Sequence, residues 1–177
     1  MSLIGDSFKV WRKFIARLRG RLIGCVVGGR GPALAYRGVI VEAAHVEFGT
    51  GVILYPGVHI FGGGHIKIGD NVAIGDGTVI CTGSRITIGA DTMVAGQCYI
   101  IDCNHGMHLG EPMRRQPMSL KEIQVGKDCW IGAGCKLLPG ADIPGGTVVG
   151  AGEVVRGSFE PLTINWSEPH FFSKSRR

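Results

Sequence analysis

The residues best suited to chemistry in this sequence form the short string Asp102, Cys103, Asn104 and His105. An imidazole changes its protonation state near neutral pH, so His105 is suited to take a proton from a hydroxyl or an amine. A nearby carboxylate fixes the tautomer of such a base and stabilises the imidazolium that forms. We therefore expect general-base catalysis by His105, with Asp102 as the orienting or acceptor-holding group and Asn104 as a helper.

The segment that follows, residues 106–122, contains two prolines and no regular apolar spacing. An irregular insertion of this length inside a regular fold is usually functional. Its side chains His108, Arg114 and Arg115 suit contact with an acidic or phosphorylated acceptor, although solvated loop charges would explain them equally well. His108 is also the main rival of His105 for the role of base.

The six cysteines form neither a disulfide framework nor a metal-binding pattern. No two of them are separated by only two residues, no secretion signal precedes them, and most lie inside apolar phrases. We interpret them as reduced core residues of a cytoplasmic protein, and we expect no metal site.

A repeat indicates which elements must position the candidate site. Residues 46–65, 66–85 and 86–105 are three copies of one twenty-residue phrase, and large apolar residues fall six apart in them and again after residue 122. The series is Phe48, Leu54, Ile60, Ile68, Ile74, Ile80, Ile88, Val94, Ile100, Val125, Ile131, Leu137, Ile143, Val149 and Val155. Helices have a period near 3.6 and strands a period of two, so this spacing indicates short strands joined by corners in three-sided coils. The sequence predicts an all-β parallel β-helix whose early coils hold two extra residues at one corner.

Alignment of the copies also places His45, His65, Arg85 and His105 at the same point of successive coils. We expect them to form a polar column on one corner. A row of solvated surface residues would produce the same pattern. Only the neighbours of His105 and the loop after it distinguish that residue from the others.

The first residues predict a basic amphipathic helix that starts near Asp6 or Ser7. Its apolar stripe comprises Ile4, Phe8, Trp11, Ile15, Leu18 and Leu22. Six basic residues against Asp6 give residues 1–21 a charge of +5, the last four residues carry +3, and the remainder is therefore about −3. Because the positive charge lies at the ends and not in an aromatic-lined groove, we expect no nucleic-acid partner. The helix is expected to cover the open end of the β-helix, to attach to an anionic membrane surface, or both.

Two strings, IIDCNHG at 100–106 and IQVGKDCWIGAGCKLLPGADIPGGTVVGAGEVV at 123–155, resemble the sugar O-acetyltransferase branch of the hexapeptide-repeat acyltransferases. The resemblance covers residues 40–156. It implies a left-handed β-helix, a homotrimer, and acetyl-CoA bound in the groove between two chains, with no metal required. It also implies that His105 deprotonates a hydroxyl of a sugar or of a glycan or lipopolysaccharide precursor, whose oxygen then attacks the thioester directly.

The same resemblance assigns residues to the cofactor. Trp130, Ala133 and Ala151 match positions beside the pantetheine arm, and Arg156 matches a position near the far end, where a cation suits phosphates. A capped corner for Trp130 and a solvated charge for Arg156 are the alternatives.

After Val155 the chain departs from the family pattern, so the nucleotide contacts have no matching motif. Trp166 and either Phe171 or Phe172 are candidates to stack on the adenine. We expect a helix at 1–24, a β-helix domain at 25–162 with its loop at 106–122, and a tail at 163–177.

Other functions remain open on the same fold. An N-acetyltransferase of an amino sugar or another small amine would differ only in its acceptor. A γ-carbonic-anhydrase-like lyase needs two zinc-binding histidines at a spacing of five, whereas His105 and His108 are three apart. A non-catalytic repeat scaffold predicts that His105→Ala leaves any activity unchanged.

Overall fold

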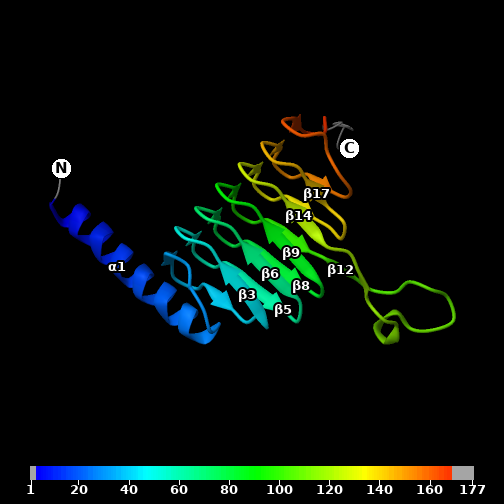
Figure 1. Cartoon of the computed structure of the whole chain (residues 1–177), viewed down its shortest axis with the longest axis horizontal. Coiled ribbons are helices and arrows are strands. Elements are labelled where there is room, and N and C mark those ends of the chain that lie inside the picture. The colour runs from blue at the N-terminus through cyan, green and yellow to red at the C-terminus, as the bar shows by residue number, and fades with distance from the viewer. Residues whose placement is uncertain (1–2, 169–177) are drawn as a thin grey trace, which may run out of the picture.

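The computed structural model describes residues 3–168 and the side chains of residues 10–168. Helix α1 (Leu3–Val26) is followed by a stack of three-sided coils made of short parallel strands. Figure 1 shows α1 against the N-terminal end of this stack and one long loop projecting from it. The predicted parallel β-helix with an N-terminal helix and one extruded loop is confirmed. The helix begins at Leu3, ahead of the predicted start at Asp6 or Ser7.

Each side of the triangle is one parallel sheet, and we call the sheets A, B and C in the order in which the chain visits them. Sheet A consists of β1 (Leu34–Ala35), β4 (Ile53–Leu54), β7 (Ala73–Ile74), β10 (Met93–Val94), β15 (Trp130–Ile131), β18 (Val148–Val149) and β20 (Ile164–Asn165). Sheet B consists of β2 (Ile40–Val41), β5 (His59–Gly62), β8 (Val79–Thr82), β11 (Tyr99–Ile101), β16 (Lys136–Leu137) and β19 (Val154–Val155). Sheet C consists of β3 (His45–Phe48), β6 (His65–Ile68), β9 (Arg85–Ile88), β14 (Ile123–Val125) and β17 (Asp142–Ile143).

The core is the inside of the triangle. All residues of the predicted six-residue series are buried there, and the most exposed of them, Phe48, shows only 6% of its surface. Full burial of one such aliphatic side chain contributes about 1.5–3 kcal/mol, so the stack of side chains supplies the main driving force for this fold. The predicted period and its inward face are therefore confirmed.

The length of a coil changes along the stack. Val94 lies twenty residues after its partner Ile74, whereas Val149 lies eighteen after Ile131. The two additional residues of the early coils lie at the corner between sheets B and C, as at residues 82–84, which agrees with the predicted extra residues at one corner. At the other end, β20 adds a strand to sheet A and extends the β-helix to Asn165, past the expected boundary at 162.

Helix α1 contacts the first coil through small residues. Ala16, Gly20 and Gly24 are buried, and a Cβ atom at Gly20 would collide with the carbonyl oxygen of Pro32. The expected covering of the coil is therefore made by this face together with the half-buried Ile23. Trp11, Leu18 and Leu22 of the predicted apolar stripe stay exposed. Among residues 3–168, no helix has both the length and the apolar character needed to cross a bilayer.

All six cysteines are free thiols. Cys98, Cys103, Cys129 and Cys135 are buried, as expected for core residues, whereas Cys25 is exposed on α1. The thiol of Cys98 donates a hydrogen bond to the carbonyl oxygen of Gly132 on the next coil, over 3.2 Å. These thiols act as small core side chains.

Candidate active site

The long loop leaves the β-helix at the corner between sheets B and C. Directly after β11, strand β12 (Cys103–Asn104) pairs with the returning strand β13 (Ser119–Leu120) in an antiparallel ladder. The backbone nitrogen of Lys121 then donates to the carbonyl oxygen of Asp102 over 2.9 Å. The chain therefore leaves and rejoins the coil at one point, and the loop is closed at its base.

Asp102 is fully buried at this corner, and its carboxylate accepts three hydrogen bonds. Thr82 Oγ1 donates to Oδ2 (2.8 Å), the backbone nitrogen of Gly83 donates to Oδ1 (2.6 Å), and that of Ser84 donates to Oδ2 (3.0 Å). Both carboxylate oxygens are thus engaged by the previous coil, and neither bonds to His105 within the described structure. Asp102 thus fixes the corner from which the loop departs, and its predicted role as the group that orients His105 or holds the acceptor stays a prediction.

His105 does not belong to the polar column that its alignment predicted. His45, His65 and Arg85 do stack in register on sheet C. The next position is occupied by Glu122, because Ile123 pairs with Ile86, and the Glu122 carboxylate lies 3.6 Å from the Arg85 guanidinium. That part of the prediction was wrong, since the chain enters the loop before it reaches sheet C. His105 is instead an exposed residue at the start of the loop, directly after Asn104.

The loop is held in shape by Gln116, which sequence reasoning did not single out. Its side chain is buried, accepts a hydrogen bond from the backbone nitrogen of His108 (2.8 Å), and donates to the carbonyl oxygens of His108 (2.8 Å) and Glu111 (2.7 Å). The short helix η1 (Met113–Arg115) presents Arg114 and Arg115, which are exposed, as is His108. The three predicted acceptor-binding side chains therefore lie on a loop of defined shape.

A cavity of about 410 Å³ lies between the loop base and sheet B. Asn104 and Arg156 both line it, so the structure brings together two residues that the sequence assigned to different roles. Lys121 adds a second cation, and Tyr99 contributes an aromatic wall. The lining also includes Ile101, Cys103, Ser119, Leu138 and Pro139. Two cations beside an apolar wall suit an anionic or phosphorylated ligand.

Burial at this corner favours the neutral forms of two thiols and one phenol. Burial raises the pKa of the Cys81 thiol from 9.0 to about 11, and it likewise raises the pKa of Cys103 and of the Tyr99 phenol. A cysteine acts as a nucleophile through its thiolate. Because Cys103 stays protonated near neutral pH, it is poorly suited to form an acyl-cysteine intermediate.

The residues matched to the pantetheine arm lie at a different corner of the triangle. Trp130 is about half exposed on the outer face of sheet A, in register with Met93 and Val148. Ala133 and Ala151 are exposed on successive coils at the corner between sheets A and B. The width of sheet B separates this corner from His105, so one chain does not bring the two sets of residues together.

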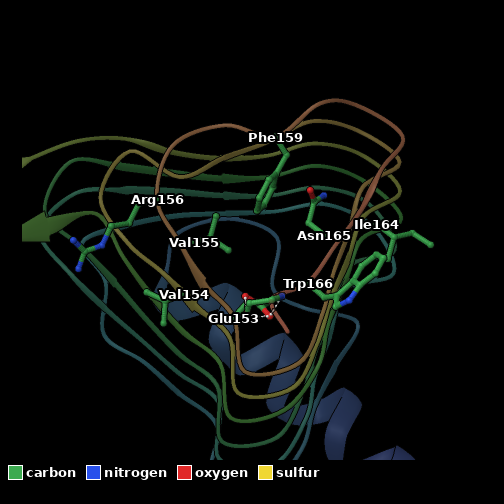
Figure 2. Close-up of a pocket in the computed structure, with 9 residues that line it drawn as sticks. Glu153, Val154, Val155, Arg156, Phe159, Ile164, Asn165 and Trp166 are labelled. Atoms are coloured by element: carbon green, nitrogen blue, oxygen red, sulfur yellow. Dashed lines mark hydrogen bonds between the residues drawn. The ribbon is translucent and has the colours of Figure 1, made fainter. Parts of the chain in front are cut away.

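A second cavity, of about 330 Å³, lies on the last coils, and Figure 2 shows its lining. Arg156 and Trp166 point away from each other on opposite sides of the coil in that view. The Glu153 carboxylate accepts hydrogen bonds from the backbone nitrogen (2.7 Å) and hydroxyl (2.8 Å) of Ser167, which lower the pKa of Glu153. Trp166 is thereby held as a largely exposed indole, whereas Phe171 and Phe172 lie outside the described residues.

Within the described part of the chain, no three His, Cys, Asp or Glu side chains gather into a group that could hold a metal ion.

Part of the chain is similar in sequence to two curated proteins that are named as acetyltransferases. A protein of Escherichia coli K12 named as a lipopolysaccharide biosynthesis O-acetyl transferase, WbbJ, is 36% identical over 85 residues, which cover 44% of this chain and 43% of WbbJ. The acetyltransferase Rv3034c of Mycobacterium tuberculosis is 34% identical over 91 residues, covering 51% of this chain and 30% of Rv3034c. The chain thus spans less than half the length of these curated relatives. No protein-family profile matches it.

A solved structure shares the fold over most of the chain. It is a variant of AntD, an N-acyltransferase of Bacillus cereus, in complex with dTDP and coenzyme A. The TM-score is 0.67 at 20% identity, over 81% of this chain and 80% of AntD. The predicted resemblance to hexapeptide-repeat sugar acyltransferases is confirmed. At this identity the likeness to AntD concerns the fold alone.

Proposed function

We propose that this protein is an acetyl-CoA-dependent O-acetyltransferase that acts on a hydroxyl of a sugar or of a glycan or lipopolysaccharide precursor. The observation that carries the proposal is the departure of the loop at the B–C corner. His105 therefore leaves the surface column, and the residue before it, Asn104, lines the cavity that Lys121 and Arg156 also line. The names of the relatives that match in sequence support the same class of reaction.

In the proposed mechanism the neutral imidazole of His105 takes the proton from the acceptor hydroxyl. The oxygen attacks the thioester carbonyl carbon, and the amide of Asn104 or a backbone N–H stabilises the oxyanion that forms. When the intermediate collapses, the carbon–sulfur bond breaks, the acetyl group stays on the acceptor oxygen, and the leaving thiolate takes the proton from the imidazolium. The protonated state of Cys103 agrees with this direct transfer.

The proposal requires two copies of the chain at each site. Ala133 and Ala151 form an exposed, small-residue surface at the A–B corner, next to Trp130 on sheet A, while His105 lies at the B–C corner of the same chain. A homotrimer in which the A–B corner of one chain faces the loop of its neighbour would combine them. In that arrangement Arg156 would bind a phosphate of the cofactor, and His108, Arg114 and Arg115 would face the acceptor.

The test is to incubate the purified protein with acetyl-CoA and a panel of free, nucleotide-linked and lipid-linked sugars, and to identify the products by mass spectrometry. Amino sugars belong in the same panel, because a product acetylated only on nitrogen would replace the proposal with the N-acetyltransferase alternative. We expect an O-acetylated sugar, and His105→Ala should lower the rate by about 10²–10⁴-fold with the fold and oligomeric state retained.

Two matched variants identify the base. His65→Ala removes an exposed imidazole from the sheet C column and should leave the rate unchanged. His108→Ala removes the rival base and should lower the rate less than His105→Ala does. Full activity of His105→Ala would reject this mechanism, and a panel without any acetylated product would reject the function.

A further inference from the structure

Helix α1 exposes a row of large apolar side chains that the β-helix does not use. Trp11, Phe14, Leu18 and Leu22 expose 59%, 57%, 49% and 57% of their surfaces. The rings of Trp11 and Phe14 stack, with centroids 5.9 Å apart. Soluble proteins rarely leave a contiguous patch of this kind in water, and such a patch usually marks an interaction surface.

This stripe lies on the side of the helix opposite to its contact with the first coil. Successive helical residues are offset by about 100°, since a turn has about 3.6 residues. The buried residues Ala16, Gly20 and Gly24 therefore share one face, and the exposed stripe is centred on the other. Figure 1 shows α1 as an outer element along the N-terminal end of the stack. The stripe can meet a partner without any change in the contact between helix and coil.

Arginines border the stripe on both sides. By the same angular offset, Arg17 and Arg21 lie along one edge and Arg12 and Arg19 along the other, and all four are exposed. A helix with an apolar stripe between two basic edges is the form that lies in a membrane interface, with its cations at the level of the lipid phosphates.

A cavity of about 530 Å³ continues the basic edge onto the β-helix. Arg12, Arg19 and Arg37 line it together with Trp11 and Tyr36, and the Arg12 guanidinium lies 5.9 Å from the centre of the Tyr36 ring. Three guanidinium groups around an amphipathic pocket suit an anionic headgroup, because arginine binds phosphate with two parallel donors.

We propose that α1 docks this protein onto an anionic lipid bilayer, with Trp11, Phe14, Leu18 and Leu22 inserted between the lipids. The flanking arginines contact lipid phosphates. A contact between the stripes of two copies is disfavoured, because a symmetric contact would bring the same arginine edges together. The proposal does not depend on acetyl transfer, so its test requires neither acetyl-CoA nor an acceptor.

The test is flotation of the full-length protein with vesicles of phosphatidylglycerol and phosphatidylcholine, and with vesicles of phosphatidylcholine alone. We expect binding to the anionic vesicles that weakens as salt is added and is at least about tenfold weaker on the neutral ones. Leu18→Asp with Leu22→Asp should weaken binding to anionic vesicles by at least about tenfold, and Arg17→Ala with Arg21→Ala by a similar factor.

The matched control is Lys67→Ala with Lys127→Ala. It changes the net charge by the same two units as either double variant but alters exposed residues of the β-helix. This control should bind anionic vesicles as the unchanged protein does, and all variants should keep the same circular dichroism spectrum. Equal binding by the Leu18→Asp, Leu22→Asp protein, or no binding by the unchanged protein, would overturn the proposal. So would a smaller oligomer for that variant in light scattering, because the stripe would then be a contact between copies.

Discussion

The A–B and B–C corners are built by the same coils, yet their residues differ in kind. At the A–B corner the late coils place exposed Ala133 and Ala151 one above the other, which leaves a smooth surface. At the B–C corner the coil places the buried carboxylate of Asp102, and from there the loop departs. The repeated core therefore fixes the positions of the corners, and the few residues at each corner decide which of them provides a surface and which supports an inserted loop.

The largest effect on the difference between the two corners is expected from Asp102→Ala, which removes the carboxylate that holds the B–C corner. The change leaves Thr82 Oγ1 and two backbone N–H groups at the corner without their acceptor. We expect the free energy of unfolding to fall by about 2–4 kcal/mol, measured by urea denaturation. Asp142→Ala, the same substitution at an exposed position of sheet C, should change it by less than about 0.5 kcal/mol. A loss below about 1 kcal/mol for Asp102→Ala would show that the corner does not depend on the carboxylate.

The environment of the B–C corner can be followed through the partly buried thiol of Cys81. With a pKa of about 11 in place of 9.0, its thiolate fraction at pH 8 is about a hundredfold lower. Alkylation by iodoacetamide, followed by mass spectrometry, should therefore modify exposed Cys25 first and Cys81 much later.

The rate at Cys81 should rise about tenfold per pH unit until the pH approaches the pKa. Because the folded-state pKa is the higher one, the stability that the neutral thiol contributes is complete below pH 9 and is lost as the pH rises toward 11. Equal labelling of Cys25 and Cys81 at pH 8 would contradict the raised pKa of Cys81.

The smooth A–B corner is tested by Ala151→Leu. If the pantetheine arm lies there, the larger side chain should raise the KM for acetyl-CoA by about tenfold with little change in kcat. Ala44→Leu, at an exposed corner of an early coil, should leave the KM unchanged. An unchanged KM for Ala151→Leu would show that acetyl-CoA binds at another surface. Both variants should unfold at the same urea concentration as the unchanged protein.

The fold could be predicted because the spacing of the core residues is visible over short stretches of the sequence. Within each phrase, buried residues of the series such as Ile74 and Ile80 stand six positions apart, and this period identifies the inward face. The position of the loop was visible for the same reason, as an interruption of the period. The matched strings pointed to the same class of protein as the relatives found in sequence.

The candidate site could be predicted less well from the sequence, because the spacing of the apolar residues does not show where the chain rejoins the coil after the loop. His105 stands twenty residues after Arg85, but Glu122 occupies the next place in the column. The role of Asp102 did leave a signal, since its partner Thr82 stands at the same place in the preceding phrase. Gln116 left no such signal, because the sequence of a polar loop does not show which of its polar residues is buried. The contact face of the helix was not predicted for another reason: the apolar stripe is conspicuous in the sequence, but the closest contacts are made by small residues such as Gly20.

Because the base of the loop is closed, the length and composition of the loop are independent of the register of the β-helix. Because residues 103–120 begin and end beside the Lys121–Asp102 hydrogen bond, the coils below continue in unbroken parallel pairing with the coils above. The excursion can therefore differ in length or composition while the scaffold keeps its register. If the loop binds the acceptor as proposed, the choice of acceptor can change in evolution without any change in the fold of the β-helix.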